Sequence, residues 1–233
     1  MSEVGSSAHV DSVAVRRWML NPPDTESVAR FVPGPGIQKL SLTFDIALLR
    51  EALGECLRRS DFMGGDWKQH GFGALPLTRR PGDATVTAND LSGRHWLRRD
   101  ERYIEEAYED YVDEAQFSKF DPKYANTYFE DVHQELTKRF PIGRMRVLSK
   151  DIYNCNSWHR DPEPRLHIPI VTNPGALFVV NHHVTHLPAD GTVYFTDTRG
   201  YHTAINGGLE RRVHIVAVLA YPGSRDGVRA AAG

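Results

Sequence analysis

The feature that most constrains the fold is a succession of short segments, rich in β-branched residues, that follows residue 142. The segments are Arg144–Leu148, Leu166–Val171, Ala176–Val180, Thr192–Thr196, Tyr201–Ile205 and Arg212–Tyr221. The turn sequences Asn173-Pro174-Gly175, Ala189-Asp190-Gly191, Thr198-Arg199-Gly200 and Asn206-Gly207-Gly208 separate several of them. Many short strands joined by such turns are typical of an antiparallel barrel or sandwich. We therefore predict a double-stranded β-helix, or jelly roll, over residues 142–221.

Residues 13–141 are predicted to form a mixed layer of helices and strands that packs on this core. Lys39–Phe44 alternates apolar and polar residues and predicts a strand. Asp45 can cap a following helix whose leucines between residues 48 and 57 share one face. Phe72–Thr78 is a further candidate strand. The predicted fold class is therefore α+β, mainly β, with N-terminal helices on a jelly-roll core.

Two further stretches complete this layer. His95–Lys119 is charged and aromatic, and we expect it to be helical in part. Its section 99–117 is read as a solvated helical face, with a lid over a substrate as the alternative. Asp121-Pro122 combines an N-cap carboxylate with proline at the first helical position, which predicts a helix ending at Phe140-Pro141. Residues 13–221 thus form one predicted domain, flanked by disordered ends at 1–12 and 222–233.

Bulk composition argues against several classes of protein. A chain of 233 residues with a net charge of −2 and a pI near 6.6 fits one domain and lacks the basic excess of nucleic-acid binders. No apolar run approaches the ~18 residues of a membrane span, and Met1–Val10 does not resemble a signal peptide. Cys56 and Cys155 lie far apart, which favours two reduced thiols over a disulfide. We expect a cytoplasmic protein without membrane or nucleic-acid partners.

His159-Arg160-Asp161 is the first candidate for chemistry. In an extended segment, residues i and i+2 point to the same face, so the imidazole and the carboxylate could meet one metal ion. His202, in a predicted strand, would supply a second imidazole. Two histidines and one carboxylate form the facial triad of non-haem iron(II) oxygenases, which leaves coordination positions open.

Arg212 is the second candidate. Asn206-Gly207-Gly208 is a hairpin turn signal. If the turn centres near Gly207, His202 and Arg212 would lie opposite each other on adjacent strands, with Cβ atoms ~5 Å apart. The planar guanidinium could then hold the distal carboxylate of a keto acid whose other end chelates the metal.

The order and spacing of several blocks resemble the aspartyl/asparaginyl β-hydroxylase-like family, to which bacterial cis-proline hydroxylases are related. The blocks lie between about residues 130 and 220 and are Ile142–Leu148, His159–Asp161, Arg165–Ile170, Asp190-Gly191, Tyr201–Asn206 and Arg212–His214. The resemblance implies a cupin-like Fe(II)- and 2-oxoglutarate-dependent dioxygenase that also uses O₂. The implied reaction is hydroxylation of an unactivated C–H bond in an amino acid, or in an amino-acid-derived or peptidyl substrate.

The same resemblance implies roles for individual residues. His159, Asp161 and His202 would bind iron. Arg212, ten residues after the distal histidine, would bind 2-oxoglutarate. By the same resemblance His167 would contact the carboxylate that chelates iron, and Arg165 would steady 2-oxoglutarate or bind a substrate carboxylate.

The reaction type depends on the carboxylate ligand. Some family members carry glycine at that position, and in related oxygenases a small residue there permits halogenation. Asp161 therefore favours hydroxylation.

Other residues near these blocks have two readings each. Asn206 belongs to a turn or contacts substrate, Trp158 packs beside the metal strand or walls a pocket, and His214 is a core histidine or a substrate contact. His182, His183 and His186 are read as a solvated loop.

Alternative functions are a non-catalytic cupin-like binding domain, a redox-inert metal hydrolase, and desaturation or halogenation at the same site. The sequence leaves the substrate and the oligomeric state open.

Overall fold

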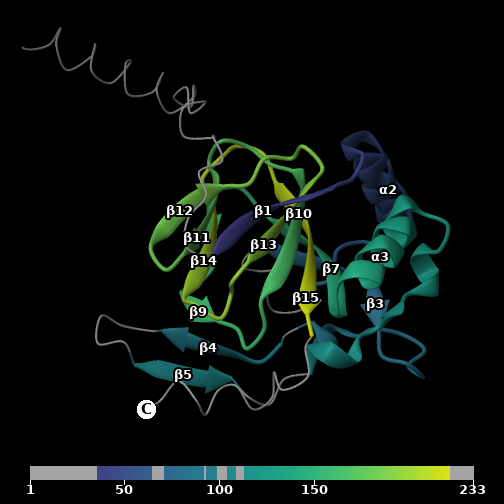
Figure 1. The fold of residues 1–233 in the computed structure, drawn as a ribbon, viewed down its shortest axis with the longest axis horizontal. Helices are drawn as coiled ribbons and strands as arrows, with labels where there is room; N and C mark the ends of the chain where they lie inside the picture. The colour runs from purple at the N-terminus through teal and green to yellow at the C-terminus, as the bar shows by residue number, and fades with distance from the viewer. Residues whose placement is uncertain (1–35, 65–70, 92, 99–103, 109–112, 221–233) are drawn as a thin grey trace, which may run out of the picture.

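The computed structural model describes residues 36–64, 71–91, 93–98, 104–108 and 113–220, which contain two antiparallel sheets (Figure 1). The predicted disordered ends, 1–12 and 222–233, lie outside the described residues. The 6-stranded sheet has the order β1 (Ile37–Thr43), β13 (Thr192–Thr196), β10 (Arg165–Val171), β15 (Arg212–Leu219), β7 (Ile142–Lys150) and β2 (Phe72–Pro76). The 7-stranded sheet has the order β12 (His183–His186), β11 (Ala176–Val180), β14 (His202–Asn206), β9 (His159–Arg160), β4 (His95–Arg98) and β5 (Glu105–Tyr108), and β8 (Asn154–Cys155) pairs with β14. A small separate ladder joins β3 (Thr78–Arg79) to β6 (Lys119–Phe120).

The path of the chain identifies the core as a jelly roll. From β7 onward, the chain passes repeatedly between the two sheets, with β7, β10, β13 and β15 in the first and β8, β9, β11, β12 and β14 in the second. Sequential strands are therefore seldom neighbours, which is how a double-stranded β-helix is wound. The predicted fold class is confirmed.

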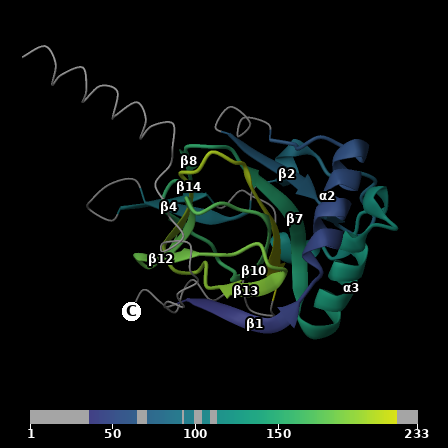
Figure 2. The ribbon, with the colours of Figure 1, turned by 90° about the horizontal axis from the view of Figure 1, so that it is seen from above.

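The first sheet has one apolar and one polar face. Alternate residues of β7, β10 and β15, such as Val147, Ile168 and Ile215, join the main hydrophobic cluster. That cluster also includes residues of α2 (Ile46–Arg59) and α3 (Tyr128–Arg139), which lie together beside β7 (Figure 2). The intervening positions, which point into the barrel, carry basic side chains and histidines, namely Arg144, Arg146, Lys150, Arg165, His167, Arg212 and His214. The helices thus bury the outer face, and the inner face is left for chemistry.

The N-terminal predictions are partly confirmed. The strand at residues 39–44 is β1, and Asp45 caps α2 by accepting from the backbone amides of Ala47 and Leu48. The two cysteines are free thiols. No helix of the described residues is long and apolar enough to span a membrane.

Two helical predictions are wrong in part. The described part of residues 95–119 forms mainly the β4–β5 hairpin, and its helical content is one 3-10 turn at Glu114–Gln116. The helix expected between Asp121 and Phe140 is confirmed as α3, which ends at its C-cap Phe140, but it begins only at Tyr128, and Pro122–Tyr124 forms a separate 3-10 turn. Asn126, with φ of 60°, adopts the left-handed conformation that interrupts the helix. Another 3-10 turn spans Ala88–Asp90.

Candidate metal centre

The three predicted metal ligands lie together inside the barrel. The ligand atoms of His159, Asp161 and His202 are all within 4.8 Å of one another. β9 pairs with β14 so that His202 and His159 are direct partners, and their ring centroids are 4.2 Å apart. Asp161 follows β9 directly and is held by its backbone amide, which donates to the carbonyl of Thr198 at 2.8 Å. Two strands that are distant in sequence therefore bring the ligands together.

Backbone contacts orient both imidazoles for a metal ion. The Nδ1 atom of His159 lies 2.8 Å from the carbonyl of Ser157, and that of His202 lies 3.0 Å from the carbonyl of Gly200. A carbonyl oxygen can only accept, so each Nδ1 carries the proton and each Nε2 keeps its lone pair. Fixing the tautomer in this way is typical of metal-binding histidines.

The charge states also suit a cation. Burial, together with the neighbouring His202, lowers the pKa of His159 to about 3, so its imidazole is neutral. Burial alone would raise the pKa of Asp161, but the Arg165 guanidinium, 2.9 Å away, holds it well below its usual range. Metal binding requires neutral histidine and ionised carboxylate. The donor set therefore fits a divalent metal ion of the facial-triad type.

A cavity of about 980 Å³ opens beside these ligands. His159 and Asp161 lie on its wall, together with Arg146 and Arg165 from the inner face of the first sheet. The β4–β5 hairpin contributes other wall residues, which are His95, Leu97 and Tyr108. Tyr108, within the stretch 99–117 for which a lid was the alternative, is therefore a cavity-wall residue. Residues 99–103 and 109–112 lie outside the described residues.

The predicted hairpin between His202 and Arg212 is wrong. β14 pairs with β11, β8 and β9, whereas β15 pairs with β10 and β7 in the other sheet. The chain after Asn206 crosses between sheets instead of turning back on itself. Asn206 anchors this crossing, because its Nδ2 donates to the carbonyls of Lys150, Asp151 and Glu210. A turn signal alone does not distinguish a hairpin from such a crossing.

Arg212 nevertheless points into the barrel. Its side chain is 5% exposed, and its Nη2 lies 2.9 Å from Nδ1 of His214. Among the described residues, no carboxylate pairs with it, and burial lowers its pKa to about 10. A buried cation without a counter-ion is unfavourable. The site is therefore chemically suited to receive an anion.

Histidines and an aromatic ring connect Arg212 with the metal ligands. Nδ1 of His214 lies 3.5 Å from Nδ1 of His167. The His167 ring contacts Phe178 at 5.0 Å, and Phe178 contacts His202 at 5.7 Å, both measured between ring centroids. Burial and the nearby Arg212 hold the pKa of His167 well below its usual value, so a neutral imidazole lies between the metal ligands and the arginine.

The tentative substrate residues lie off the cavity wall. Asn206 is fully buried in the crossing, and His214 lies between Arg212 and His167. Trp158 is half-buried, with its ring centroid 5.4 Å from that of His182. A substrate contact for these residues stays a prediction. The prediction that His182, His183 and His186 lie in a solvated loop is wrong in part. His183–His186 forms β12, and the buried His186 contacts the carbonyl of Ala176 through Nδ1 at 3.0 Å.

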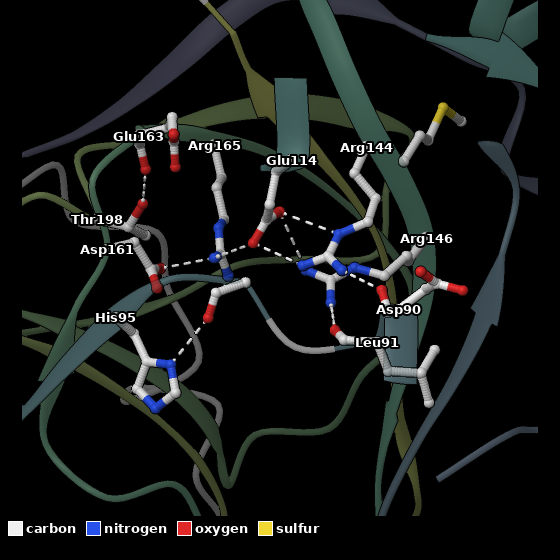
Figure 3. A network of polar contacts seen from close by, with 12 residues as sticks. Asp90, Leu91, His95, Glu114, Arg144, Arg146, Asp161, Glu163, Arg165 and Thr198 are labelled. Carbon is white, nitrogen blue, oxygen red and sulfur yellow. Dashed lines mark hydrogen bonds and ion pairs between the residues drawn. The ribbon is translucent and has the colours of Figure 1, made fainter. Parts of the chain in front are cut away.

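Sequence reasoning missed a buried ionic network beside the ligands (Figure 3). The carboxylate of Glu114, 2% exposed, lies 2.6 Å from Arg144, 3.3 Å from Arg165 and 3.6 Å from Arg146. Burial alone would raise the pKa of Glu114, but these three arginines lower it to about 2. The alternation Arg144-Met145-Arg146 in a predicted strand was the available signal, since it places two arginines on one face. The sequence gives no sign that Glu114 would meet them.

A second missed contact, here called the Glu105 clasp, joins the β4–β5 hairpin to the ligand strands. Glu105 binds Arg160, the residue between His159 and Asp161, through both carboxylate oxygens, at 2.5 and 2.9 Å. It also accepts a hydrogen bond from the hydroxyl of Tyr201, the residue before His202. One carboxylate therefore connects both ligand-bearing segments to the cavity wall.

No family model matches the chain, and no curated protein matches its sequence. Similar solved structures include an oxidoreductase of the 2OG-Fe(II) oxygenase family from Burkholderia pseudomallei, with a TM-score of 0.47 and 14% identity, covering 85% of this chain and 90% of that one. A prolyl-4-hydroxylase from Pseudomonas putida has a TM-score of 0.45 and 9% identity, with coverages of 84% and 97%. The viral collagen prolyl hydroxylase of Paramecium Bursaria Chlorella virus-1 has a TM-score of 0.46 and 8% identity, with coverages of 81% and 98%. Likenesses this distant are no evidence about activity.

Proposed function

We propose that the protein is an Fe(II)- and 2-oxoglutarate-dependent dioxygenase that hydroxylates an unactivated C–H bond. The observation that carries the proposal is a cluster of two histidines and one aspartate, with Asp161 and His202 buried, inside the same barrel as a buried arginine that has no described carboxylate partner. A metal hydrolase would need the first feature but has no use for the second. When bound, iron with 2-oxoglutarate and O₂ supplies the oxidising chemistry.

The residues of this chain would supply binding and orientation. His159, Asp161 and His202 would hold the metal through two Nε2 atoms and a carboxylate. Arg212 would hold the distal carboxylate of 2-oxoglutarate through its planar pair of N–H donors, which binds carboxylates bidentately. His167, between Arg212 and the ligands, is proposed to contact the 2-oxoglutarate carboxylate that lies near the metal. Arg165 would steady the same molecule or receive a substrate carboxylate.

The substrate is proposed only as a chemical class. By resemblance we propose an amino acid, free, carrier-bound or within a peptide, and hydroxylation as the outcome because Asp161 occupies the position where a small residue would leave room for halide. The protein is proposed to act in the cytoplasm.

The proposal is tested first on the cosubstrate. Purified protein reconstituted anaerobically with Fe(II) and then exposed to O₂ should convert 2-oxoglutarate to succinate, and a panel of amino acids and peptides should accelerate this conversion with a mass gain of one oxygen. A non-catalytic binding domain would bind metal without any succinate release. Absence of turnover across the panel, together with unchanged metal affinity in His202→Ala, would overturn the proposal.

Arg212 offers a sharper test with a matched neighbour. Arg212→Gln should raise the Kd for 2-oxoglutarate about 100-fold, since two charge-assisted hydrogen bonds contribute about 1.5 kcal/mol each. Arg211 adjoins it in sequence but is 54% exposed and pairs with Asp151, so Arg211→Gln should leave the Kd unchanged. Equal effects of the two substitutions would show that Arg212 does not bind the cosubstrate. Calorimetry on Mn²⁺-loaded protein measures both without turnover.

A further inference from the structure

The cavity end beside the metal ligands is built around a cluster of guanidiniums. Three guanidiniums, from Arg144, Arg146 and Arg165, converge on the single carboxylate of Glu114. Asp161 is the other carboxylate bound to this group, through Arg165, and it is also a proposed metal ligand. A bound divalent cation would add positive charge at this end of the cavity, and Asp161 would then be shared between Arg165 and the metal.

Two other acids of this region form no ion pair with Arg146. Among the described residues, the buried Glu163 has no ion pair with any of the three guanidiniums, and Asp90 pairs with Arg80 at 2.8 Å.

Arg146 is the member of the group that is least compensated. It is 3% exposed, and its ion pair with Glu114, at 3.6 Å, is the longest of the three. Its Nη1 donates to the carbonyl of Leu91 at 2.5 Å, but its buried Nε has no hydrogen-bond partner. Burial and the neighbouring Arg144 lower its pKa to about 9. Arg146 lies on the cavity wall, whereas Arg144 does not.

Arg146 and Arg212 belong to different ends of the inner face. On the β7–β15 ladder, Arg212 is opposite Lys150, whereas Arg146 is opposite Val216. Positions four residues apart on a strand are separated by about 13 Å. Arg212 is enclosed and absent from the cavity wall, so an anion held there is distinct from one that enters the cavity and meets Arg146.

The cavity wall has an apolar part, formed by Leu91, Leu97 and Leu148, and a polar part that includes Asn154, Asn156 and Ser157. His95 and Tyr108 stack on each other with centroids 4.9 Å apart and an interplanar angle of 3°. A cavity of about 980 Å³ is at the upper end of the range for small-molecule sites, which is about 300–1,000 Å³. It is therefore large enough for more than a free amino acid.

Resting on the proposed function, we infer that the substrate bears a carboxylate that binds Arg146, with an apolar body against the leucines and the His95–Tyr108 stack. His159 and Asp161 lie on the wall of the same cavity, so a substrate anchored at Arg146 extends toward the metal. Arg146 is thus a specificity-determining residue, separate from the arginine that holds 2-oxoglutarate.

The test compares acids with their neutral amides. Protein saturated with Mn²⁺ and 2-oxoglutarate is titrated by calorimetry with N-acetyl-L-leucine and N-acetyl-L-phenylalanine, and with the primary amide of each. The acids should bind at least about tenfold more tightly, since a buried charge-assisted pair is worth more than a neutral contact. Equal binding, or no binding, of acid and amide in both pairs would overturn the inference.

Variants then show which arginine causes the preference for acids over amides. Arg146→Gln should abolish it, and Arg146→Lys should weaken it. Arg144→Gln removes a guanidinium from the same carboxylate and strand face but not from the cavity wall, so it should keep the preference. Retention in Arg146→Gln, or equal loss in Arg144→Gln, would refute the assignment. If Arg146→Gln does not fold, Arg146→Lys and the wild-type comparison decide.

Succinate release is measured separately on the iron-loaded enzyme. Succinate release without acid preference refutes the substrate inference alone. Acid preference without succinate release refutes the proposed dioxygenase activity and leaves the carboxylate site standing.

Discussion

Replacing Glu114 by glutamine should be among the most destabilising isosteric changes in this protein. The carboxylate is 2% exposed and lies within 3.6 Å of three guanidiniums, which are themselves buried or nearly so. Glutamine keeps the shape but removes the negative charge. Arg144 and Arg146 then remain buried beside each other without a counter-ion.

Two independent arguments give a similar loss in the free energy of unfolding for Glu114→Gln. Removing one partner of a buried ion pair typically costs about 3–5 kcal/mol. Independently, the pKa of Glu114 falls from 4.5 to about 2, and at about 1.4 kcal/mol per unit this corresponds to about 3 kcal/mol. A loss of about 3 kcal/mol is a large part of the 5–15 kcal/mol that stabilises typical domains.

The pKa of Glu114 also fixes the pH dependence. A carboxyl whose pKa is depressed on folding contributes stability that is complete above its unfolded pKa, near 4.5, and is lost as pH falls toward 2. The free-energy difference between wild type and Glu114→Gln should therefore be largest at neutral pH and shrink below pH 4.5.

Urea unfolding followed by tryptophan fluorescence and circular dichroism measures this difference. Glu135→Gln is the matched control, because Glu135 pairs with Arg139 at 2.6 Å on the surface of α3 and should cost less than about 1 kcal/mol. A cost for Glu114→Gln that does not exceed the Glu135→Gln cost would refute the reasoning. So would a difference that grows below pH 4.5.

Three other changes test the site and its surroundings. His202→Ala should lower Mn²⁺ affinity at least about 10-fold, whereas the exposed control His182→Ala should not, as measured by calorimetry. Glu105→Gln should weaken Mn²⁺ binding severalfold and cost about 1 kcal/mol of stability, because the clasp is partly exposed; unchanged metal affinity would show that the clasp does not position the ligand strands. Burial and the nearby Arg212 lower the pKa of Lys150 to about 8, so wild-type stability relative to Lys150→Met should rise between pH 8 and 10.5; a flat difference in urea unfolding would contradict this.

The sequence was most informative where periodicity is strong and contacts are local. The strands after residue 142 and the Asp45-capped helix depend on side-chain alternation and nearby backbone groups, and both were predicted closely. The prediction of partial helix over residues 95–119 failed because residues that form a short, half-buried hairpin show no clear hydrophobic period in the sequence. The helix start predicted at Asp121 was wrong because Asn126 adopts a left-handed conformation, so Asp121 caps only a 3-10 turn.

The site shows the same division. His159 and Asp161 are separated by one residue in an extended segment, so their convergence follows from strand geometry. Arg212 does face into the barrel, but the hairpin that was used to place it is wrong, because its strand belongs to the opposite sheet. The partners of Glu114 and Glu105 lie 30 to 96 residues away and depend on how the sheets fold over each other, which no local pattern records.

The two sheets divide the proposed binding roles between them. Strands β9 and β14 of one sheet supply the histidines that would hold a cation. Strands β7, β10 and β15 of the other sheet supply arginines, which repel a metal and attract carboxylates. In the proposed complex, a dicarboxylate that chelates the metal bridges from one sheet to the other, and Arg212, its proposed anchor, faces the ligands across the barrel. A neighbour of His202 in the same ladder would lie beside the metal and too close to hold the far end of a five-carbon acid.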